Sequence, residues 1–305
     1  MGNSKLRSLQ KKIWLKSSGV IYNISPILAS KVLFLFSMKK RLNLKNPKTF
    51  NEKIQWLKLY WQDPRVAKCA DKYDLREYVE SCGLEELLNP IYGIYTDVNN
   101  IDFDKLPKKF ALKGTHGCGY NLICTDKEKL NINETREIAK RWMKSRYAYV
   151  AAEIQYDKMT PKIIIEKFID GIDGNVVTDY KIFCFNGKPT ITMVCEGRGE
   201  CERAKYYFYD NFWEVKPYNK DSTELIKSGR KKHADKPKSF DNMIKYAEVL
   251  SKPFPFVRVD FYDVNGKPIL GEMTFTPCGG IDSRLNPEVD ILMGNLINLP
   301  DKYIK

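Results

Sequence analysis

Two acidic residues stand in an otherwise apolar, strand-like stretch near the carboxyl end of the chain. In residues 258–280, RVDFYDVNGKPILGEMTFTPCGG, Asp260 and Glu272 occupy even positions, whereas odd positions such as Val259, Phe261 and Met273 are apolar. Alternation with a period of two predicts two strands, each buried on one face. The two carboxylates are therefore expected on the polar face of a hairpin.

The turn of this hairpin decides whether the two acids share a face. Asn265-Gly266 is a typical hairpin-turn dipeptide. A two-residue loop would pair odd with even positions and bury charge, whereas a three-residue loop with Gly266 left-handed at a bulge pairs even with even positions. We therefore expect the three-residue loop. It gathers four polar side chains on one face: Arg258, Asp260, Glu272 and Thr274.

Two neighbouring carboxylates repel each other unless a cation or a shared proton intervenes. Hard oxygen ligands suit Mg²⁺, which binds through one or two protein carboxylates and leaves its other positions to phosphate and water. A magnesium site at Asp260 and Glu272 is one interpretation. A solvated outer face and a glycosidase-type acid pair are the alternatives that this stretch leaves open.

A glycine-rich loop lies between two short strands in FALKGTHGCGYNLICT, residues 110–125. It follows Lys113, and it matches neither a Walker loop nor a dinucleotide fingerprint. The strand–loop–strand layout is that of a lid whose backbone N–H groups cover nucleotide phosphates. Gly117 and Gly119 would let the backbone approach a phosphate closely. An ordinary mobile hairpin loop is the alternative.

Other candidate residues are weaker when each is taken alone. In KIIIEKFIDG, residues 162–171, Glu166 and the backbone of Phe168 could bind adenosine, although a core strand with one exposed glutamate is the better explanation of this stretch taken alone. Lys181 in DYKIFCFNG and Lys72 in CADKY, which is expected on a helix, could reach phosphates or be solvated. Two arginines near a turn could bind an acidic substrate: Arg198 and Arg203.

Composition and charge bound the class of protein. The chain has 305 residues, of which 43% are hydrophobic and 29% charged, as expected for a soluble globular protein of one or two domains without a membrane span. Eight cysteines without a Cys-x-x-Cys pair and only two histidines disfavour a zinc site and a Ser-His-Asp hydrolase.

The positive charge is concentrated at the amino end. Of the net charge of +13, residues 1–51 contribute eleven Lys/Arg and no Asp or Glu, around the apolar run ISPILASKVLFLFSMKK. Such a basic amphipathic segment favours an anionic membrane surface or a partner protein over nucleic acid, which we do not expect to bind. A helical extension with a solvated basic side is the alternative.

The expected element order indicates an α+β fold. Helices are expected from about residue 50, over 63–83, over two stretches between 131 and 157, and over 239–252, with strands concentrated from residue 161 onward. Antiparallel hairpins among these strands make a doubly wound parallel sheet unfavourable.

Taken in order, these motifs resemble those of the ATP-grasp superfamily. The motifs are Asp71-Lys72, Lys113 with Gly117 and Gly119, Glu166 to Gly171, and Arg258/Asp260 with Glu272. More narrowly, NPKTFNEKIQWLKLY, ADKYDLREYV, KGTHGCGYN, DYKIFCFNG and GEMTFTPCGG are similar to the TupA-like ATP-grasp family over roughly residues 45–290. That family is associated with teichuronopeptide and capsular polysaccharide assembly in bacteria. The superfamily has Asn where this chain has Thr274.

The resemblance implies a fold of two α+β subdomains with antiparallel sheets that grip a nucleotide. It divides the chain into a basic helical extension (1–45), a reduced segment preceding the ATP-grasp domain (46–105) and the ATP-grasp domain itself (106–305). It also implies roles for individual residues. Mg²⁺ would be held by Asp260 and Glu272, with Thr274 a weaker third ligand; phosphates by Lys72, Lys113, Lys181 and the lid at Gly117 and Gly119; adenosine by Glu166 and Phe168; and the transferring phosphoryl group by Arg258.

The implied activity is an ATP- and Mg²⁺-dependent carboxylate–amine ligation through an acyl phosphate. It would join an amino acid or amine to a sugar acid of a cell-surface polysaccharide, in the cytoplasm or at the inner face of the membrane. Three alternatives remain open: a kinase on the same nucleotide site, a glycosyltransferase that uses a nucleotide sugar, and a non-catalytic protein of the polysaccharide assembly held by residues 1–45.

Overall fold

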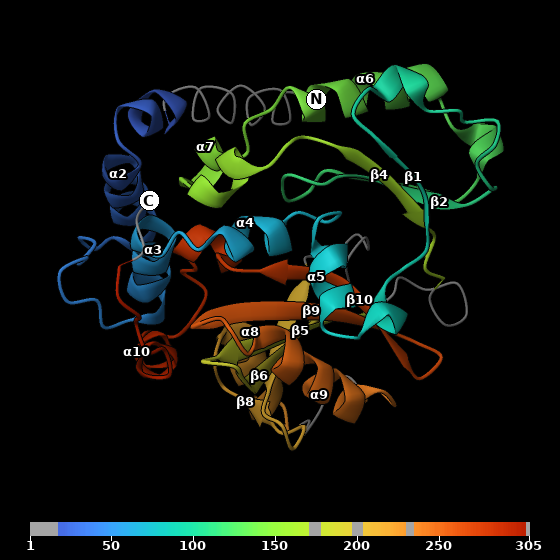
Figure 1. Cartoon of the computed structure of the whole chain (residues 1–305). Helices are drawn as coiled ribbons and strands as arrows, with labels where there is room; N and C mark the ends of the chain where they lie inside the picture. Colours follow the sequence, from blue (N-terminus) through green and yellow to red (C-terminus); the bar gives the residue numbers. More distant parts are fainter. Residues whose placement is uncertain (1–17, 171–177, 197–203, 230–234, 303–305) are drawn as a thin grey trace.

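The computed structural model describes residues 18–170, 178–196, 204–229 and 235–302. Its strands form two separate sheets, and all pairings between named strands are antiparallel (Figure 1). The four-stranded sheet has the order β1 (Ile91–Tyr95), β4 (Ile163–Lys167), β2 (Phe110–Gly114), β3 (Asn121–Cys124). The six-stranded sheet has the order β10 (Lys267–Thr274), β9 (Phe256–Val264), β5 (Asp179–Phe185), β6 (Lys188–Glu196), β7 (Lys205–Tyr209), β8 (Val215–Lys216). The predicted α+β class is confirmed.

Helices surround and connect the sheets. Residues 18–24 are helical. The α-helices that follow are α2 (Pro26–Met38), α3 (Phe50–Tyr60), α4 (Pro64–Ala70), α5 (Leu75–Ser81), α6 (Ile132–Met143), α7 (Ala148–Ala151), α8 (Lys220–Lys227), α9 (Phe240–Ser251) and α10 (Pro287–Asn295). Short 3₁₀ segments are η1 (Glu85–Leu87), η2 (Val98–Asn100), η3 (Lys127–Lys129), η4 (Ile154–Lys158) and η6 (Pro277–Gly280). None of the described helices is long and apolar enough to cross a bilayer.

The helix expected from about residue 50 is α3, and local chemistry explains where it begins. Thr49 and Glu52 form a capping box, in which each side chain accepts a hydrogen bond from the other residue's backbone N–H. This satisfies donors that the first turn of a helix leaves without partners. Phe50 and Ile54 then follow at helical spacing, and both are buried.

The prediction of a single helix over 63–83 is wrong, because this segment forms two helices, α4 and α5. The Asp71 carboxylate accepts hydrogen bonds from the backbone N–H groups of Tyr73 and Asp74, at 2.8 and 3.0 Å. Side-chain bonds of this kind compete with helical backbone bonds and favour a turn. Lys72 therefore lies in the turn between the two helices, not on a helix as expected.

The expected three-residue hairpin loop is also wrong. Val264 pairs with Lys267, so the turn is the two-residue Asn265-Gly266, with φ of 55° and 79°. Positive φ at both positions is typical of a type I′ turn. The register then shifts at Gly271, and Glu272 pairs with Asp260. The acids do share a face, but a bulge within β10 achieves this, not the turn.

The six-stranded sheet is covered on both faces at the end away from its charged residues. On one face Ile182 and Cys184 of β5 belong to a core that also contains Met243 of α9. On the other face Phe183 packs against Phe50 of α3, with ring centroids 6.3 Å apart. Strand alternation puts Asp179 and Lys181 on the same face as Phe183. This face is therefore apolar beneath α3 and charged farther along β5.

Candidate active site

A large cavity lies between the two sheets and has a volume of about 640 Å³. Pockets that hold small molecules usually have volumes of roughly 300–1,000 Å³. Residues from β2, β5, β9, β10, α7 and the loop after β10 line it. Of the residues predicted from the sequence, it is lined by Lys72, Lys113, Gly119, Lys181, Arg258, Asp260, Glu272 and Thr274.

The polar row on β9 and β10 forms one hydrogen-bonded group. Arg258 grips Asp260 through two bonds of 2.7 Å, from Nε to Oδ1 and from Nη2 to Oδ2. The same Nη2 donates to Thr274 Oγ1 at 3.0 Å and lies 3.4 Å from Glu272 Oε1. The four side chains that sequence alternation grouped on one face are therefore in direct contact.

Lys181 adds a second cation to this group from the neighbouring strand β5. Its Nζ lies 2.5 Å from Asp260 Oδ2 and 2.7 Å from Asp179 Oδ2. The pairing is built into the sheet, because Lys181 and Asp260 are register partners between β5 and β9. Asp260 is almost fully buried, with 1% exposure, and thus depends on these cations for compensation.

Electrostatics keep the acid on β10 ionised. Burial alone would raise the pKa of Glu272, but Lys72, Lys181 and Arg258 outweigh burial and hold that pKa at about 2. Burial lowers the pKa of Lys181, and Asp260 opposes it strongly enough that the pKa is raised overall. At neutral pH the cavity therefore presents an ionised carboxylate beside fixed cations.

The glycine-rich loop between β2 and β3 lines the same cavity with Cys118 and Gly119, and it contacts Lys72. Lys72 Nζ donates to the carbonyl oxygen of Gly117 at 2.7 Å, and its backbone N–H donates to Thr115 O at 3.3 Å. Gly119 has a φ of +76° and lines the cavity, whereas Gly117 is not among the lining residues. The structure thus brings the predicted lid to the predicted phosphate-binding lysine.

Neither of the two residues predicted to bind adenosine, Glu166 and Phe168, lines the large cavity directly. Glu166 of β4 accepts from Lys113 Nζ at 2.6 Å, so it reaches the cavity through that lysine. The Phe168 ring lies 5.4 Å from Lys109 Nζ, and Phe168 is outside the lining. Their adenosine role remains a prediction. Arg198 and Arg203 lie outside the described residues.

Sequence reasoning missed the wall formed by α7 and η4. Tyr147, Glu153 and Tyr156 line the cavity there. Glu153 accepts a 2.5 Å hydrogen bond from Thr276, a residue of the segment after β10. No sequence signal marked these residues, because α7 is a single short turn without a motif. Other lining residues that sequence reasoning missed include Tyr206, Tyr262, Cys278 and Arg284.

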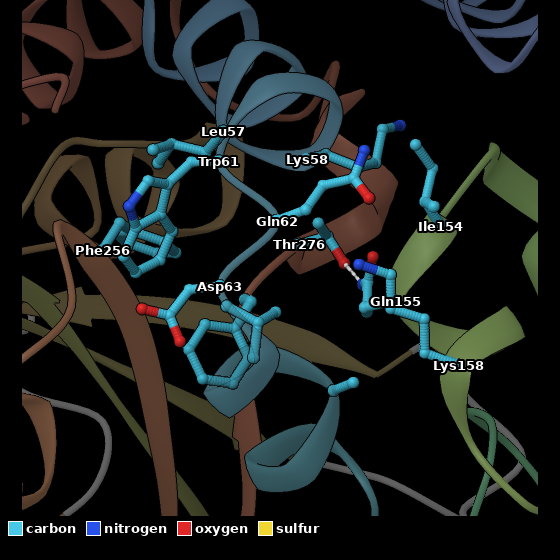
Figure 2. A pocket seen from close by; sticks show the side chains of 13 residues that line it. Leu57, Lys58, Trp61, Gln62, Asp63, Ile154, Gln155, Lys158, Phe256 and Thr276 are labelled. Atoms are coloured by element: carbon cyan, nitrogen blue, oxygen red, sulfur yellow. Dashed lines mark hydrogen bonds between the residues drawn. The ribbon is translucent and has the colours of Figure 1, made fainter. Parts of the chain in front are cut away.

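A second cavity lies behind this wall and is much smaller, at about 30 Å³. That volume is about what one water molecule fills, so it cannot hold a nucleotide. Figure 2 shows its side chains, including the hydrogen bond of 2.8 Å from Gln155 Nε2 to Thr276 Oγ1. Gln155 and Glu153 thus both form hydrogen bonds with Thr276. The residues around the small cavity therefore stabilise the wall of the large one.

With this geometry in view, comparison with known proteins identifies the family. The sequence matches the family described as TupA-like ATPgrasp over residues 52–298, which is most of the chain. The chain belongs to the TupA-like ATP-grasp family. The resemblance inferred from the motifs is confirmed. No curated protein matches the sequence.

The chain is also similar to solved structures, at low sequence identity. D-alanine–D-alanine ligase from Bacillus anthracis, complexed with ATP, is 16% identical, with a TM-score of 0.43 over 69% of this chain and 56% of that one. The Helicobacter pylori D-alanine–D-alanine ligase is 13% identical, with a TM-score of 0.44 over 84% and 68%. ATP-grasp ligase PsnB, complexed with a phosphomimetic variant of its minimal precursor, Mg and ADP, is 10% identical, with a TM-score of 0.39 over 76% and 59%.

The side chains around Asp260 and Glu272 offer oxygen donors of the kind that Mg²⁺ prefers. Among the described residues, no group of three or more His, Cys, Asp and Glu side chains could hold a metal. Two carboxylates and the Thr274 hydroxyl are hard oxygen donors, but several of their oxygens already accept hydrogen bonds from Arg258 or Lys181. The set fits Mg²⁺ when phosphate oxygens complete the coordination.

Proposed function

We propose that this ATP-grasp protein is an ATP- and Mg²⁺-dependent carboxylate–amine ligase. A substrate carboxylate oxygen would attack the γ-phosphorus of ATP, forming an acyl phosphate and releasing ADP. An amine would then attack the acyl carbon and expel inorganic phosphate, and the nitrogen would lose a proton as the amide forms. The protein's share of such a reaction is positioning and charge neutralisation.

The observation that carries the proposal is the convergence of charge in one cavity. Lys72, Lys113, Lys181 and Arg258 come from four separate segments and line the same space as Asp260 and Glu272. A polyphosphate needs several cations and a divalent metal, and this cavity supplies the cations and the oxygen donors. A glycosidase-type acid pair does not require this set of lysines.

In the proposal Asp260 and Glu272 hold Mg²⁺, with Thr274 as a weaker oxygen donor. The metal would neutralise charge on the phosphates when it is bound. Arg258 is already fixed beside both acids and would stabilise the transferring phosphoryl group, whose charge is spread over its oxygens.

The phosphates would be bound by lysines and by the glycine-rich loop. Lys113 and Lys181 are each paired with a carboxylate, and their ammonium groups are held in place before a nucleotide arrives. Lys72 would exchange the Gly117 carbonyl for a phosphate oxygen, which frees the loop to turn its N–H groups inward. Glu166 would exchange Lys113 for ribose hydroxyls, and the backbone near Phe168 would read adenine.

The enzyme would join an amino acid or amine to a sugar acid of a bacterial cell-surface polysaccharide. The support is the association of the family with such polymers, which is a fold-level argument. Cytoplasmic location at the inner face of the membrane belongs to the same proposal. The described helices neither require it nor oppose it.

The test is calorimetric titration of ATP with Mg²⁺ into the wild type and Glu272→Ala. UDP-glucose is the control ligand, and Glu288→Ala is the control variant because Glu288 is exposed on α10 and outside the cavity lining. We expect ATP to bind, the Glu272 variant to lose that binding, and the Glu288 variant to keep it. No binding of ATP, or a preference for the sugar nucleotide, would favour the glycosyltransferase.

Turnover separates the ligase from a kinase on the same site. Carboxylate substrates would be screened for ADP release in the presence of hydroxylamine, which converts an acyl phosphate into a hydroxamate. A ligase gives ADP and hydroxamate together. A kinase that phosphorylates a hydroxyl group gives ADP and no hydroxamate.

A further inference from the structure

Large exposed apolar side chains cluster on the helical segment at the amino end of the described chain. Six of the thirteen large hydrophobic residues that are exposed in the described part lie between residues 20 and 36: Val20, Ile24, Ile27, Leu28, Leu35 and Phe36. Ile24 is 72% exposed and Phe36 60%. Single exposed apolar residues are ordinary, but a contiguous set marks an interaction surface. We call these six residues the α2 face.

The opposite side of this segment packs against α7, so the α2 face points away from the protein. Ala29 and Leu33 of α2 are buried against Ala148 and Ala152, at α7. Just before α2, Tyr22 packs edge-on against Tyr149 with ring centroids 5.5 Å apart. The helix is thus anchored on the protein by one side, and the six apolar side chains of the α2 face are 37–72% exposed.

The charged residues of the segment that carries the α2 face are all basic. Residues 1–51 contain eleven Lys/Arg and no Asp or Glu. In the described part of this segment, Lys31 is exposed within α2, and Lys39, Lys40 and Arg41 are exposed directly after it. An apolar face with a basic border is complementary to lipid with anionic headgroups. A protein partner would have to supply both a hydrophobic surface and several acids in one place.

We propose that the α2 face docks in the plane of an anionic lipid membrane. Ile24, Leu28 and Leu35 would insert at the boundary between headgroups and acyl chains, and the basic residues would bind lipid phosphates. The 13 residues of α2 rise only about 20 Å, so the helix lies on the surface and does not span the bilayer.

This docking would bring the membrane close to one wall of the large cavity. The inner side of α2 packs on α7, and Tyr147, Val150 and Ala151 of that region line the cavity. A substrate anchored in lipid could therefore approach from the α7 side. The docking itself does not rest on the proposed ligase activity.

The experiment is co-sedimentation of the full chain with vesicles of phosphatidylcholine alone or mixed with phosphatidylglycerol. We expect binding to the anionic vesicles, and a loss of about tenfold or more in partitioning for Leu28→Asp/Phe36→Asp and for Lys39→Glu/Lys40→Glu/Arg41→Glu. Phe212→Asp is the matched control, because Phe212 is 88% exposed in the turn after β7. It should bind like the wild type.

Several results would overturn the proposal. These are the absence of wild-type binding, equal binding to neutral and anionic vesicles, and an equal loss in Phe212→Asp. Self-association through the α2 face without vesicle binding would also overturn it and indicate a second copy as the occupant. Thermal unfolding of each variant checks that the fold is retained. Failure of ATP to bind the wild type would reject the ligase and leave this result unchanged.

Discussion

Arg258 holds Asp260 by two parallel hydrogen bonds of 2.7 Å, and both side chains are buried. Bidentate pairs of this type fix geometry as well as charge. Lys181 contacts the same carboxylate from β5. Asp260 thus helps to position two cations of the cavity, Arg258 and Lys181, in the protein without metal or nucleotide.

Replacing Asp260 by Asn should therefore destabilise the fold and abolish binding of ATP with Mg²⁺. The amide presents an N–H group where a cation now donates, and Arg258 loses the closer of its two charged partners and keeps only Glu272 at 3.4 Å. Breaking a buried ion pair costs about 3–5 kcal/mol, and we expect roughly 3 kcal/mol because Lys181 keeps Asp179. Denaturant unfolding and calorimetric titration measure the two effects.

Asp241→Asn is the matched control for this prediction. Asp241 forms an ion pair of 2.8 Å with Lys236, but its side chain is 79% exposed. Exposed pairs contribute little to stability because solvent screens them, so the variant should unfold almost like the wild type and bind ATP normally. A similar loss of stability in both variants would show that burial of Asp260 is not what makes it important.

The depressed pKa of Glu272 predicts a pH dependence of stability. The pKa is lowered from 4.5 to about 2 in the folded protein. As the pH falls below about 4.5, the unfolded chain takes up a proton at this residue while the native protein does not, so the wild type loses stability. Glu272→Gln should be less stable than the wild type at neutral pH, and the gap should narrow toward pH 3.

Denaturant unfolding of both proteins at a series of pH values tests this. Curves that converge on acidification support a carboxylate held ionised by Lys72, Lys181 and Arg258. Curves that stay parallel would mean that these cations do not stabilise the ionised form.

Binding of Mg²⁺ should depend on the nucleotide. Both oxygens of Asp260 already accept hydrogen bonds from Arg258 or Lys181, and Glu272 Oε1 lies near Arg258 and Thr274. Mg²⁺ alone would have to displace these donors without gaining phosphate ligands. We expect a non-hydrolysable ATP analogue to raise the affinity for Mg²⁺ by about tenfold or more, and Mg²⁺ to raise that of the analogue equally. Equal Mg²⁺ affinity with and without the analogue would contradict this.

The sequence predicted the polar row at the site because its residues follow simple local rules. Strand alternation placed Arg258, Asp260, Glu272 and Thr274 together, and the structure agrees. The prediction that a three-residue turn brings these residues together is wrong. A two-residue turn alone would pair Gly271 with Asp260 and turn Glu272 toward the core. The bulge at Gly271 corrects the register. A glycine in a strand suggests a bulge, but the register is decided by tertiary packing.

The parts that sequence could not predict depend on long-range contacts. Glu153 reaches the cavity because Thr276 and Gln155 fix the wall formed by α7 and η4. These contacts join residues more than a hundred positions apart, and no local pattern encodes them. The helical spacing of the residues around Lys72 predicts a helix at this position. The side chain of Asp71 breaks that helix through its own hydrogen bonds.

The two lid glycines should respond differently to substitution by Ala. A Cβ at Gly117 would lie 2.6 Å from the Tyr120 ring and 3.0 Å from the Tyr147 ring. Tyr120 cannot easily yield, since it stacks on Trp142 at 5.8 Å and accepts a hydrogen bond from Ser145. Gly117→Ala should therefore cost about 1–3 kcal/mol and weaken binding of ATP with Mg²⁺, because a displaced loop would not bring its backbone N–H groups to the phosphates.

Gly119 has no atom within 4 Å of such a Cβ, and its φ of +76° is the only obstacle. Gly119→Ala should cost about 1 kcal/mol through backbone strain. Removing the Tyr120 ring distinguishes the two causes. In a Tyr120→Ala background the cost of Gly117→Ala should shrink, because the shortest contacts of the new Cβ are gone and only the Tyr147 ring remains, whereas the cost of Gly119→Ala should persist. If both costs persist unchanged, the backbone of the loop constrains it and packing against Tyr120 does not. The Tyr120 ring would then not explain why residue 117 has to be glycine.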